Sequence, residues 1–235
     1  MGCEFESRPG HHTINTGMKY LENALTHDEC QLFQDFWKKN EAGRSYVNWA
    51  IGDKVLDRRL RVLPHEPEWE IIQRVVSQNF KSTVDVWAAY QKQFFAHNLH
   101  IDDYAKEQDL PTYTFVLSVI TEPRFRTILW KETAAHNEAM QTEVRKWHLY
   151  RNQMTKVSTI SETEDLEHTP GEEDKTYFVD YLHLDGIFSY RAGDGVLFNA
   201  RQYHCTSNWT KYPEFDSREF LQIHVVSEEK LELSC

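Results

Sequence analysis

The sequence predicts a mainly β fold with flanking helices, in which a β-sandwich or barrel carries two helices packed on one of its sheets. From residue 90 onward, apolar and polar residues alternate with the period of two that is typical of half-buried strands. Glycine and aspartate separate these runs, most clearly at Gly193-Asp194-Gly195. Before residue 82 the apolar spacing is helical instead. The predicted strands are 90–102, 112–120, 125–132, 177–184, 187–191, 195–199, 203–208 and 218–226.

Two helices are predicted in the N-terminal part of the chain. The first follows Thr26, a favourable N-cap, and Glu29 three residues later completes a capping box. We expect this helix to end at Gly43. The second begins at Pro67, because proline is well tolerated in a first helical turn. Each carries an apolar stripe, which we interpret as core packing rather than as a cofactor site.

The composition favours a globular protein and argues against two classes of partner. The 235 residues are enough for a full hydrophobic core. A formal net charge of −11 argues against nucleic acid and anionic membranes as main partners, because each of these binds a basic face. Seven of the acidic residues lie in 162–174, which contains no lysine or arginine. The acidity is therefore concentrated in one segment, which weakens the case against anionic partners only moderately.

The cysteines predict a reducing, cytoplasmic location. They are far apart and form no CxxC pair, which argues against a disulfide scaffold and a zinc knuckle. No apolar stretch reaches the roughly 18 residues of a membrane span, and we find no apolar signal segment at the N-terminus. The four cysteines are Cys3, Cys30, Cys205 and Cys235.

Two residues of metal-binding type share one face at the end of a predicted strand. His100 and Asp102 are separated by one residue, so their side chains project to the same side, with Asn98 beside them. Leu99 and Ile101 project to the opposite, packing side. One imidazole and one carboxylate supply two of the three ligands of the 2-His-1-carboxylate triad that binds non-haem Fe(II).

Two later residues extend this pattern. His204 follows the Gly-Asp turn and opens the next apolar run, where it is the candidate third ligand. Arg218 begins the polar, inward face of the last predicted strand. A buried guanidinium is costly unless an anion meets it, and its planar fork suits a carboxylate. His183 and His224 are the rival candidates for the third ligand, and Arg126 and Arg201 are the rival anion anchors.

Taken in order, His100-x-Asp102, His204 after a Gly-Asp turn, and Arg218 resemble the Fe(II)/2-oxoglutarate-dependent dioxygenase superfamily over residues 90–226. The resemblance implies a double-stranded β-helix, a jelly roll whose mouth holds the iron. It implies that His100, Asp102 and His204 are the catalytic metal ligands. It also implies that Arg218 binds the distal carboxylate of the co-substrate 2-oxoglutarate and that O₂ is the oxidant.

Three further residues are expected near the co-substrate. Asn98 shares the face of the metal ligands and is a candidate to hydrogen-bond 2-oxoglutarate or substrate. Tyr90 and Thr114 are candidates to line the mouth of the barrel. For each of the three, the alternative is an ordinary packing or surface position.

We expect one dioxygenase domain over residues 18–235, with a helical N-terminal part at 18–82 and a jelly-roll core at 88–228. The insertion at 132–176, which contains the acidic run, is interpreted as a lid-like segment over the site. Residues 1–17 are polar and without pattern, and are expected to be a flexible tail or residues foreign to the native chain.

The resemblance implies oxidation of a C–H bond of a small molecule, such as an amino acid or a natural-product intermediate, with release of succinate and CO₂. The carboxylate of Asp102 favours hydroxylation, desaturation or ring closure over halogenation, because halogenating relatives lack that ligand. The alternatives are an oxygenase that modifies protein or nucleic acid and a jelly-roll module that binds without turnover. A binding module has no need of the anion anchor Arg218, so this residue discriminates between them. The sequence leaves the oligomeric state open.

Overall fold

The computed structural model describes residues 18–51, 53–94, 100–102, 110–133, 184–206, 214 and 216–231. They form two helices and two antiparallel sheets. The helices are α1 (His27–Arg44) and α2 (Glu68–Ser77). The strands are β1 (Met18–Leu21), β2 (Tyr46–Ile51), β3 (Lys54–Arg61), β4 (Asp85–Gln93), β5 (Thr112–Ser118), β6 (Glu122–Thr133), β7 (Leu184–Tyr190), β8 (Gly195–Asn199), β9 (Gln202–Thr206) and β10 (Arg218–Val226).

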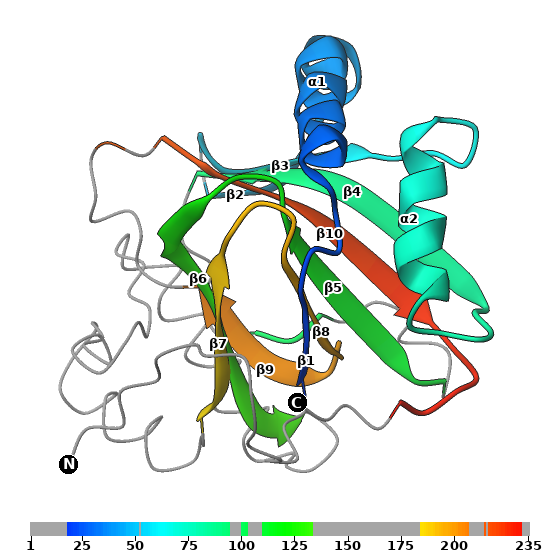
Figure 1. The fold of residues 1–235 in the computed structure, drawn as a ribbon. Helices are drawn as coiled ribbons and strands as arrows, with labels where there is room; N and C mark the ends of the chain where they lie inside the picture. The colour runs from blue at the N-terminus through cyan, green and yellow to red at the C-terminus, as the bar shows by residue number, and fades with distance from the viewer. Residues whose placement is uncertain are drawn as a thin grey trace, which may run out of the picture.

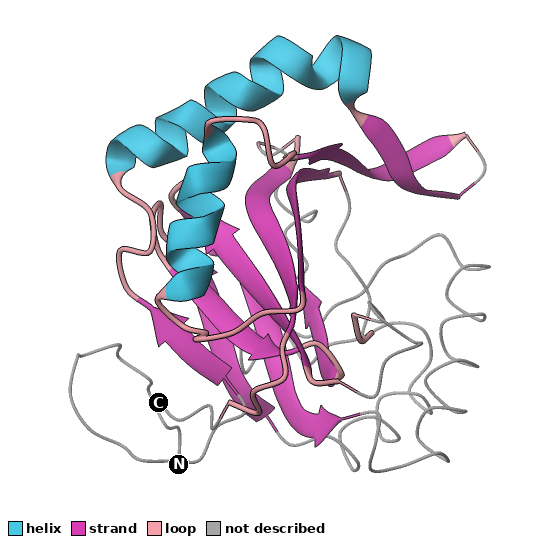
Figure 2. Cartoon of the chain, turned by 90° about the vertical axis from the view of Figure 1, so that its right-hand side faces the viewer, coloured by secondary structure: helices cyan, strands magenta, loops and turns pink. Residues whose placement is uncertain are grey.

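The strands form a sandwich of a large and a small sheet. The large sheet has the order β1-β8-β5-β10-β4-β3-β2, and the small sheet has the order β7-β6-β9. Both helices lie on the face of the large sheet that points away from the small one (Figure 1, Figure 2). Neighbours such as β5 and β10 are far apart in sequence, as a jelly roll requires. The predicted mainly β class with helices on one sheet is therefore confirmed.

The helix-covered face is the larger of two apolar cores. Helix α1 begins with the predicted capping box: the Thr26 hydroxyl accepts from the Glu29 amide, and the Glu29 carboxylate accepts from the Thr26 amide. Glu29 also pairs with Arg74 of α2 at 2.8 Å, which links the two helices. Phe33 and Trp37 of α1 pack with every second residue of β10, as the alternation in the sequence predicts. Neither described helix is long and apolar enough to cross a bilayer.

A second apolar cluster fills the space between the two sheets. Phe220 of β10, which alternates with the helix-facing residues, belongs to it. The remaining buried members come from β5, β6, β7 and β8, and are Val116, Phe125, Leu129, Phe188, Tyr190, Val196 and Phe198. The two faces of β10 thus pack in different layers, and this fixes the register of β10 against its neighbouring strands.

The N-terminal part of the chain differs from the expectation, because it also contributes three strands to the large sheet. β1 pairs with β8 across a long sequence separation, so no local pattern indicates it. β2 and β3 form the outer hairpin of the sheet, and β-bulges interrupt their pairing around Trp49. These irregularities interrupt the period of two in both strands, and in β3 the consecutive Arg58 and Arg59 obscure it further.

Strand β4 also differs from its prediction. It starts at Asp85 and ends at Gln93, whereas the prediction was one strand over 90–102. Of the remainder, residues 100–102 are described separately and pair through an isolated bridge. The predicted tail at 1–17, the predicted strand at 177–184 except for Leu184, and most of the insertion at 132–176 lie outside the described residues.

Candidate metal centre

Backbone pairing brings the His100 segment onto strand β9. The amide of His100 donates to the carbonyl of His204 at 2.9 Å, and the amide of His204 donates back to the carbonyl of His100 at 2.9 Å. Two residues on, the Asp102 amide donates to the carbonyl of Ala200 at 2.8 Å. This antiparallel pairing places the H-x-D segment directly beside His204, although the two are about one hundred residues apart in sequence.

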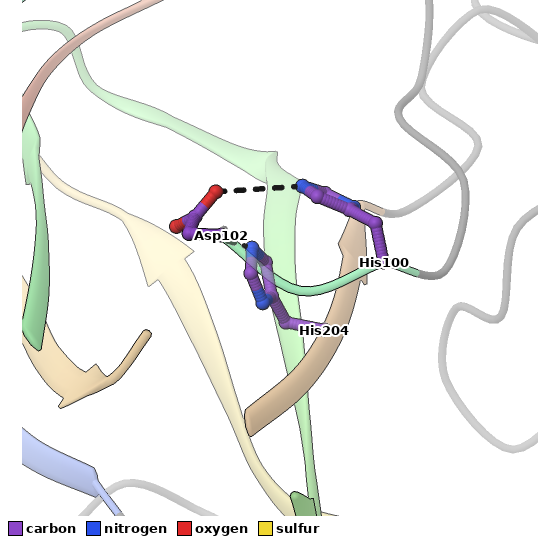
Figure 3. Close-up of side chains that lie close together, drawn as sticks. All are labelled: His100, Asp102 and His204. Carbon is purple, nitrogen blue, oxygen red and sulfur yellow. Dashed lines mark ion pairs between the residues drawn. The ribbon is translucent and has the colours of Figure 1, made fainter. Parts of the chain in front are cut away.

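The side chains of His100, Asp102 and His204 converge on one point (Figure 3). Each offers one ligand atom, and the three atoms lie within 4.8 Å of one another. His100 Nε2 is 3.8 Å from Asp102 Oδ1, and His204 Nε2 is 3.6 Å from Asp102 Oδ2. The structure thus brings together the three residues that the sequence analysis selected as ligands.

The tautomer of His204 suits a metal. Its Nδ1 lies 2.9 Å from the carbonyl oxygen of Gln202. A carbonyl only accepts, so Nδ1 must carry the proton and donate, which leaves the Nε2 lone pair directed at the other two ligands. The ring packs against Phe198, with centroids 4.8 Å apart, and this contact restricts its orientation.

Asp102 is held by a polar chain on the inner face of the large sheet. The hydroxyl of Thr114 donates to Asp102 Oδ2 at 2.8 Å, and Gln222 Nε2 lies 3.5 Å from the same oxygen. The Thr114 hydroxyl has one proton, so His224 Nδ1, 3.1 Å away, is the donor in the contact between them. With Oδ2 engaged in this way, Oδ1 is the oxygen better placed for a metal.

Electrostatics keep Asp102 ionised. Burial alone would raise its pKa, but the imidazoles of His204, His224 and His100 outweigh burial and hold the pKa well below its usual range. An ionised carboxylate and two imidazoles are the donor set of non-haem Fe(II) centres, and three ligands on one side leave positions open for other molecules. The residues present therefore fit an iron ion.

Arg218 is buried, as its place on the inward face of the last predicted strand implies. Its side chain is 2% exposed and lies over the rings of Phe220 and Tyr190, with centroid distances of 4.5 and 4.9 Å. One terminal nitrogen donates to the carbonyl of Arg126 at 3.3 Å, whereas Nε has no partner and the guanidinium makes no ion pair within the described residues. Burial lowers the pKa of Arg218, so its charge is under-compensated without an anion.

The other predicted site residues fall in different places. Thr114 touches a metal ligand, as described, rather than an open mouth. Tyr90 departs from the expectation: it is fully buried on the helix-covered face, where its ring packs on Trp37 and its hydroxyl donates to Glu219. A side chain on that face points away from the metal centre, so we leave Tyr90 out of the site. Asn98 lies outside the described residues.

The rival candidates are also placed. His224 contacts the Thr114 hydroxyl that donates to Asp102, and it is not part of the cluster of ligand atoms. His183 lies outside the described residues. Arg201 is exposed in the turn between β8 and β9, and the Arg126 side chain is half-buried with its Nε directed at the carbonyl of Pro123. Of these arginines, only Arg218 is buried.

Metal-free protein should lose stability on mild acidification because of His224. Burial lowers the pKa of this imidazole to about 4, against a usual value of about 6.5. Between these values the unfolded chain binds a proton that the folded protein does not, so stability falls as the pH drops, by up to about 3 kcal/mol. Denaturant titrations from pH 7 to pH 4 measure this, with His224→Gln as the comparison. An identical pH slope in the variant would contradict the assignment.

Comparison with known proteins identifies the fold. No protein-family model and no curated protein matches the sequence. Among solved structures, the α-ketoglutarate-dependent epimerase SnoN from nogalamycin biosynthesis aligns with 91% of this chain and 79% of its own, at a TM-score of 0.59 and 12% identity. The α-ketoglutarate-dependent carbocyclase SnoK gives a TM-score of 0.55 at 14% identity, covering 91% of this chain and 80% of its own.

A third similar structure carries the relevant small molecules. HygX from Streptomyces hygroscopicus, with nickel and 2-oxoglutarate bound, aligns with 93% of this chain and 85% of its own, at a TM-score of 0.52 and 12% identity. The chain therefore has the fold of non-haem, 2-oxoglutarate-dependent enzymes. The resemblance predicted from the H-x-D, His204 and Arg218 pattern is confirmed at the level of the fold, and the His-Asp-His group stands where that pattern requires it.

Proposed function

We propose that the protein is an Fe(II)- and 2-oxoglutarate-dependent oxygenase that hydroxylates a C–H bond of a small molecule. The observation that carries the proposal is the convergence of one ligand atom each from His100, Asp102 and His204. In this proposal those residues hold the iron, and Arg218 binds the distal carboxylate of 2-oxoglutarate. Iron with 2-oxoglutarate supplies the power to oxidise a C–H bond with O₂, while 2-oxoglutarate becomes succinate and CO₂.

The chain's own groups have separable roles in this proposal. His204 and Asp102 are fixed in orientation by Gln202 and Thr114 before any metal binds, which reduces the reorganisation needed on binding. The guanidinium of Arg218 orients the co-substrate by a charge-assisted contact in a water-poor environment. Phe220 and Tyr190 flank that guanidinium and exclude water from it.

Small-molecule chemistry is supported by the similar structures. SnoN has been solved in complex with nogalamycin RO, and HygX with hygromycin B. Because SnoN is named an epimerase and SnoK a carbocyclase, the fold is compatible with several outcomes. Hydroxylation adds one oxygen atom to the substrate, ring closure removes two hydrogens, and epimerisation leaves the mass unchanged, so product mass spectrometry distinguishes them. We also propose a reducing compartment such as the cytoplasm, since Cys30 and Cys205 are buried thiols and not a disulfide.

The test begins with co-substrate binding under anaerobic conditions. Addition of Fe(II) and 2-oxoglutarate to the purified protein should produce a visible chelate band that requires both components. Subsequent O₂ should release succinate, faster with a candidate metabolite that is a substrate. A protein that binds both components without any succinate release across the panel would point to the non-catalytic alternative. Absence of the chelate band would contradict the proposal that the protein is an oxygenase.

A further inference from the structure

The inner face of the large sheet is divided into an apolar and a polar half. The apolar half, on β5, β8 and the Phe220 end of β10, packs against the small sheet. Strands β3 and β4 lie beside β10 in the same sheet (Figure 1), and they contribute buried apolar side chains to the helix-covered core. On their inner face, no residue of β3 or β4 belongs to either apolar cluster of the described residues.

Beyond Trp87 and Ala89, the inner face of β4 and the neighbouring β3 carries polar side chains in register across the strands. Gln93 of β4 pairs with Asp57 of β3 and with Arg218 of β10, and Gln91 pairs with Arg59 and Phe220. Asp57 is fully buried, and Gln91 and Gln93 are each 1% exposed. We call Asp57, Gln91, Gln93 and Gln222 the polar wall. An ordinary core would hold apolar residues at these positions.

Hydrogen bonds engage the amide nitrogens of Gln91 and Gln222, whereas several acceptors of the polar wall have no donor. Gln91 Nε2 donates to Asp57 Oδ2 at 3.0 Å, and Asn48 Nδ2 donates to the same oxygen at 3.1 Å. Arg59 lies 4.0 Å from that oxygen, and its buried Nε has no partner among the described residues. The amide oxygens of Gln91, Gln93 and Gln222 are buried without a partner in the described part of the chain. Buried acceptors without donors cost stability, so a donor from outside the chain is favoured there.

Gln222 joins the polar wall to the metal centre. Its Nε2 lies 3.5 Å from Asp102 Oδ2, while its own amide oxygen is one of the three without a partner. On β10 it is two residues from Phe220, which pairs with Gln91 on the neighbouring strand. A molecule hydrogen-bonded to the wall would therefore lie next to the iron ligands.

We propose that the polar wall is the substrate-binding surface and that the substrate bears several hydroxyl or ammonium groups, which donate to Gln91, Gln93 and Gln222. This inference rests on the proposed function of the metal centre. Hydroxyl and ammonium groups share the required chemistry, and the buried carboxylate of Asp57 adds attraction for an ammonium group. A site built to accept these hydrogen bonds rejects an analogue that lacks the donors, because its acceptors are then left unpaired.

The test uses ligand-detected NMR on protein loaded anaerobically with Fe(II) and 2-oxoglutarate. The probes are three sets of six-membered rings: polyhydroxylated, amino-substituted and deoxygenated. At least one of the donor-bearing sets should bind at least tenfold more tightly than the deoxygenated rings, and the preferred set shows which donor is used. Equal binding of the deoxygenated rings, or no binding of either donor-bearing set, would overturn the proposal.

Variants locate the binding surface. Gln93→Met, which preserves volume, and Gln91→Leu should each weaken probe binding at least tenfold and leave the chelate band of Fe(II) and 2-oxoglutarate unchanged. Gln73→Leu makes the same kind of change at an exposed position on α2 and should have no effect. Unchanged probe binding in both wall variants, or loss of 2-oxoglutarate binding with probe binding retained, would contradict the assignment. Failure of the wild-type protein to form the chelate band would instead count against the proposed function.

Discussion

Replacement of Asp102 or His204 by alanine is expected to abolish Fe(II) binding and succinate formation. In the proposed site each residue supplies one of the three ligand atoms found among the described residues, and these lie within 4.8 Å of one another. Loss of a group that merely supports a ligand costs roughly 10–100-fold in metal affinity or activity, so loss of a ligand itself should cost more than that. Metal titration and succinate release under saturating 2-oxoglutarate measure the two effects separately.

Controls for these variants must separate ligand loss from unfolding. Asp102→Ala leaves the hydroxyl of Thr114 and the amide of Gln222 short of a partner, at a cost of about 1–3 kcal/mol for each group that stays buried and unpaired. Thermal unfolding should therefore occur at a lower temperature but remain cooperative. His65→Ala and Asp53→Ala change the same residue types at exposed positions and should retain metal binding and activity. Retained activity in Asp102→Ala or His204→Ala would show that the ligand assignment is wrong.

Replacement of Arg218 by methionine is expected to weaken 2-oxoglutarate binding strongly. Truncation of one partner of a buried, hydrogen-bonded charge pair costs about 2–5 kcal/mol, which corresponds to roughly thirty- to several-thousand-fold in affinity. Fe(II) binding should be unaffected, since the guanidinium is not part of the ligand cluster. Titration of the chelate band with 2-oxoglutarate at fixed Fe(II) provides the measurement.

The same variant should behave in the opposite way in a stability measurement. Without co-substrate, Arg218 is buried with no ion pair among the described residues, and its Nε has no partner. Replacing such a charge by an apolar side chain of similar volume is often neutral or stabilising. Arg218→Met should therefore unfold at the same denaturant concentration as the wild type, or at a higher one. A large loss of stability would mean that the arginine is a structural ion-pair partner and not an anion site.

Arg126→Met and Arg201→Met serve as matched controls, because both arginines were rival anchors on sequence grounds. Neither is buried, and each should leave the affinity for 2-oxoglutarate within about threefold of the wild-type value. If Arg201→Met weakened 2-oxoglutarate binding and Arg218→Met did not, the anchor would lie in the turn before β9. Weakened binding in Arg218→Met alone would assign the role to the buried residue on β10.

Several features could be predicted from the sequence because short-range physics determines them. The capping box at Thr26 needs only residues within one helical turn. His100 and Asp102 meet because alternate residues of an extended chain share a side. The side of the sheet on which Arg218 lies can be predicted in the same way, because apolar residues alternate with the polar ones along β10. In each case the signal lies within a few residues of the group concerned.

Other features could not be read from local patterns. Both faces of β4 carry small or amphipathic residues over the run Ala88-Ala89-Tyr90-Gln91. The polarity of these residues therefore does not indicate that Tyr90 packs against the helices. Which face is which depends on pairing with β10, since Tyr90 lies opposite Leu221. A one-residue difference in that register would exchange the two faces. Tyr90 was therefore mistaken for a residue near the co-substrate.

The sequence by itself predicted the jelly-roll class, which the fold confirms, and singled out His100, Asp102, His204 and Arg218 as candidate site residues, because their spacing and order along the predicted strands resemble those of a known family. Only the tertiary structure decided that β2 and β3 extend the large sheet, that Thr114 and His224 hold Asp102, and that a polar wall adjoins the metal centre. These contacts join strands that are distant in the chain. Their residues reveal a role only once long-range pairing has placed them on one face and burial has removed water from their polar groups.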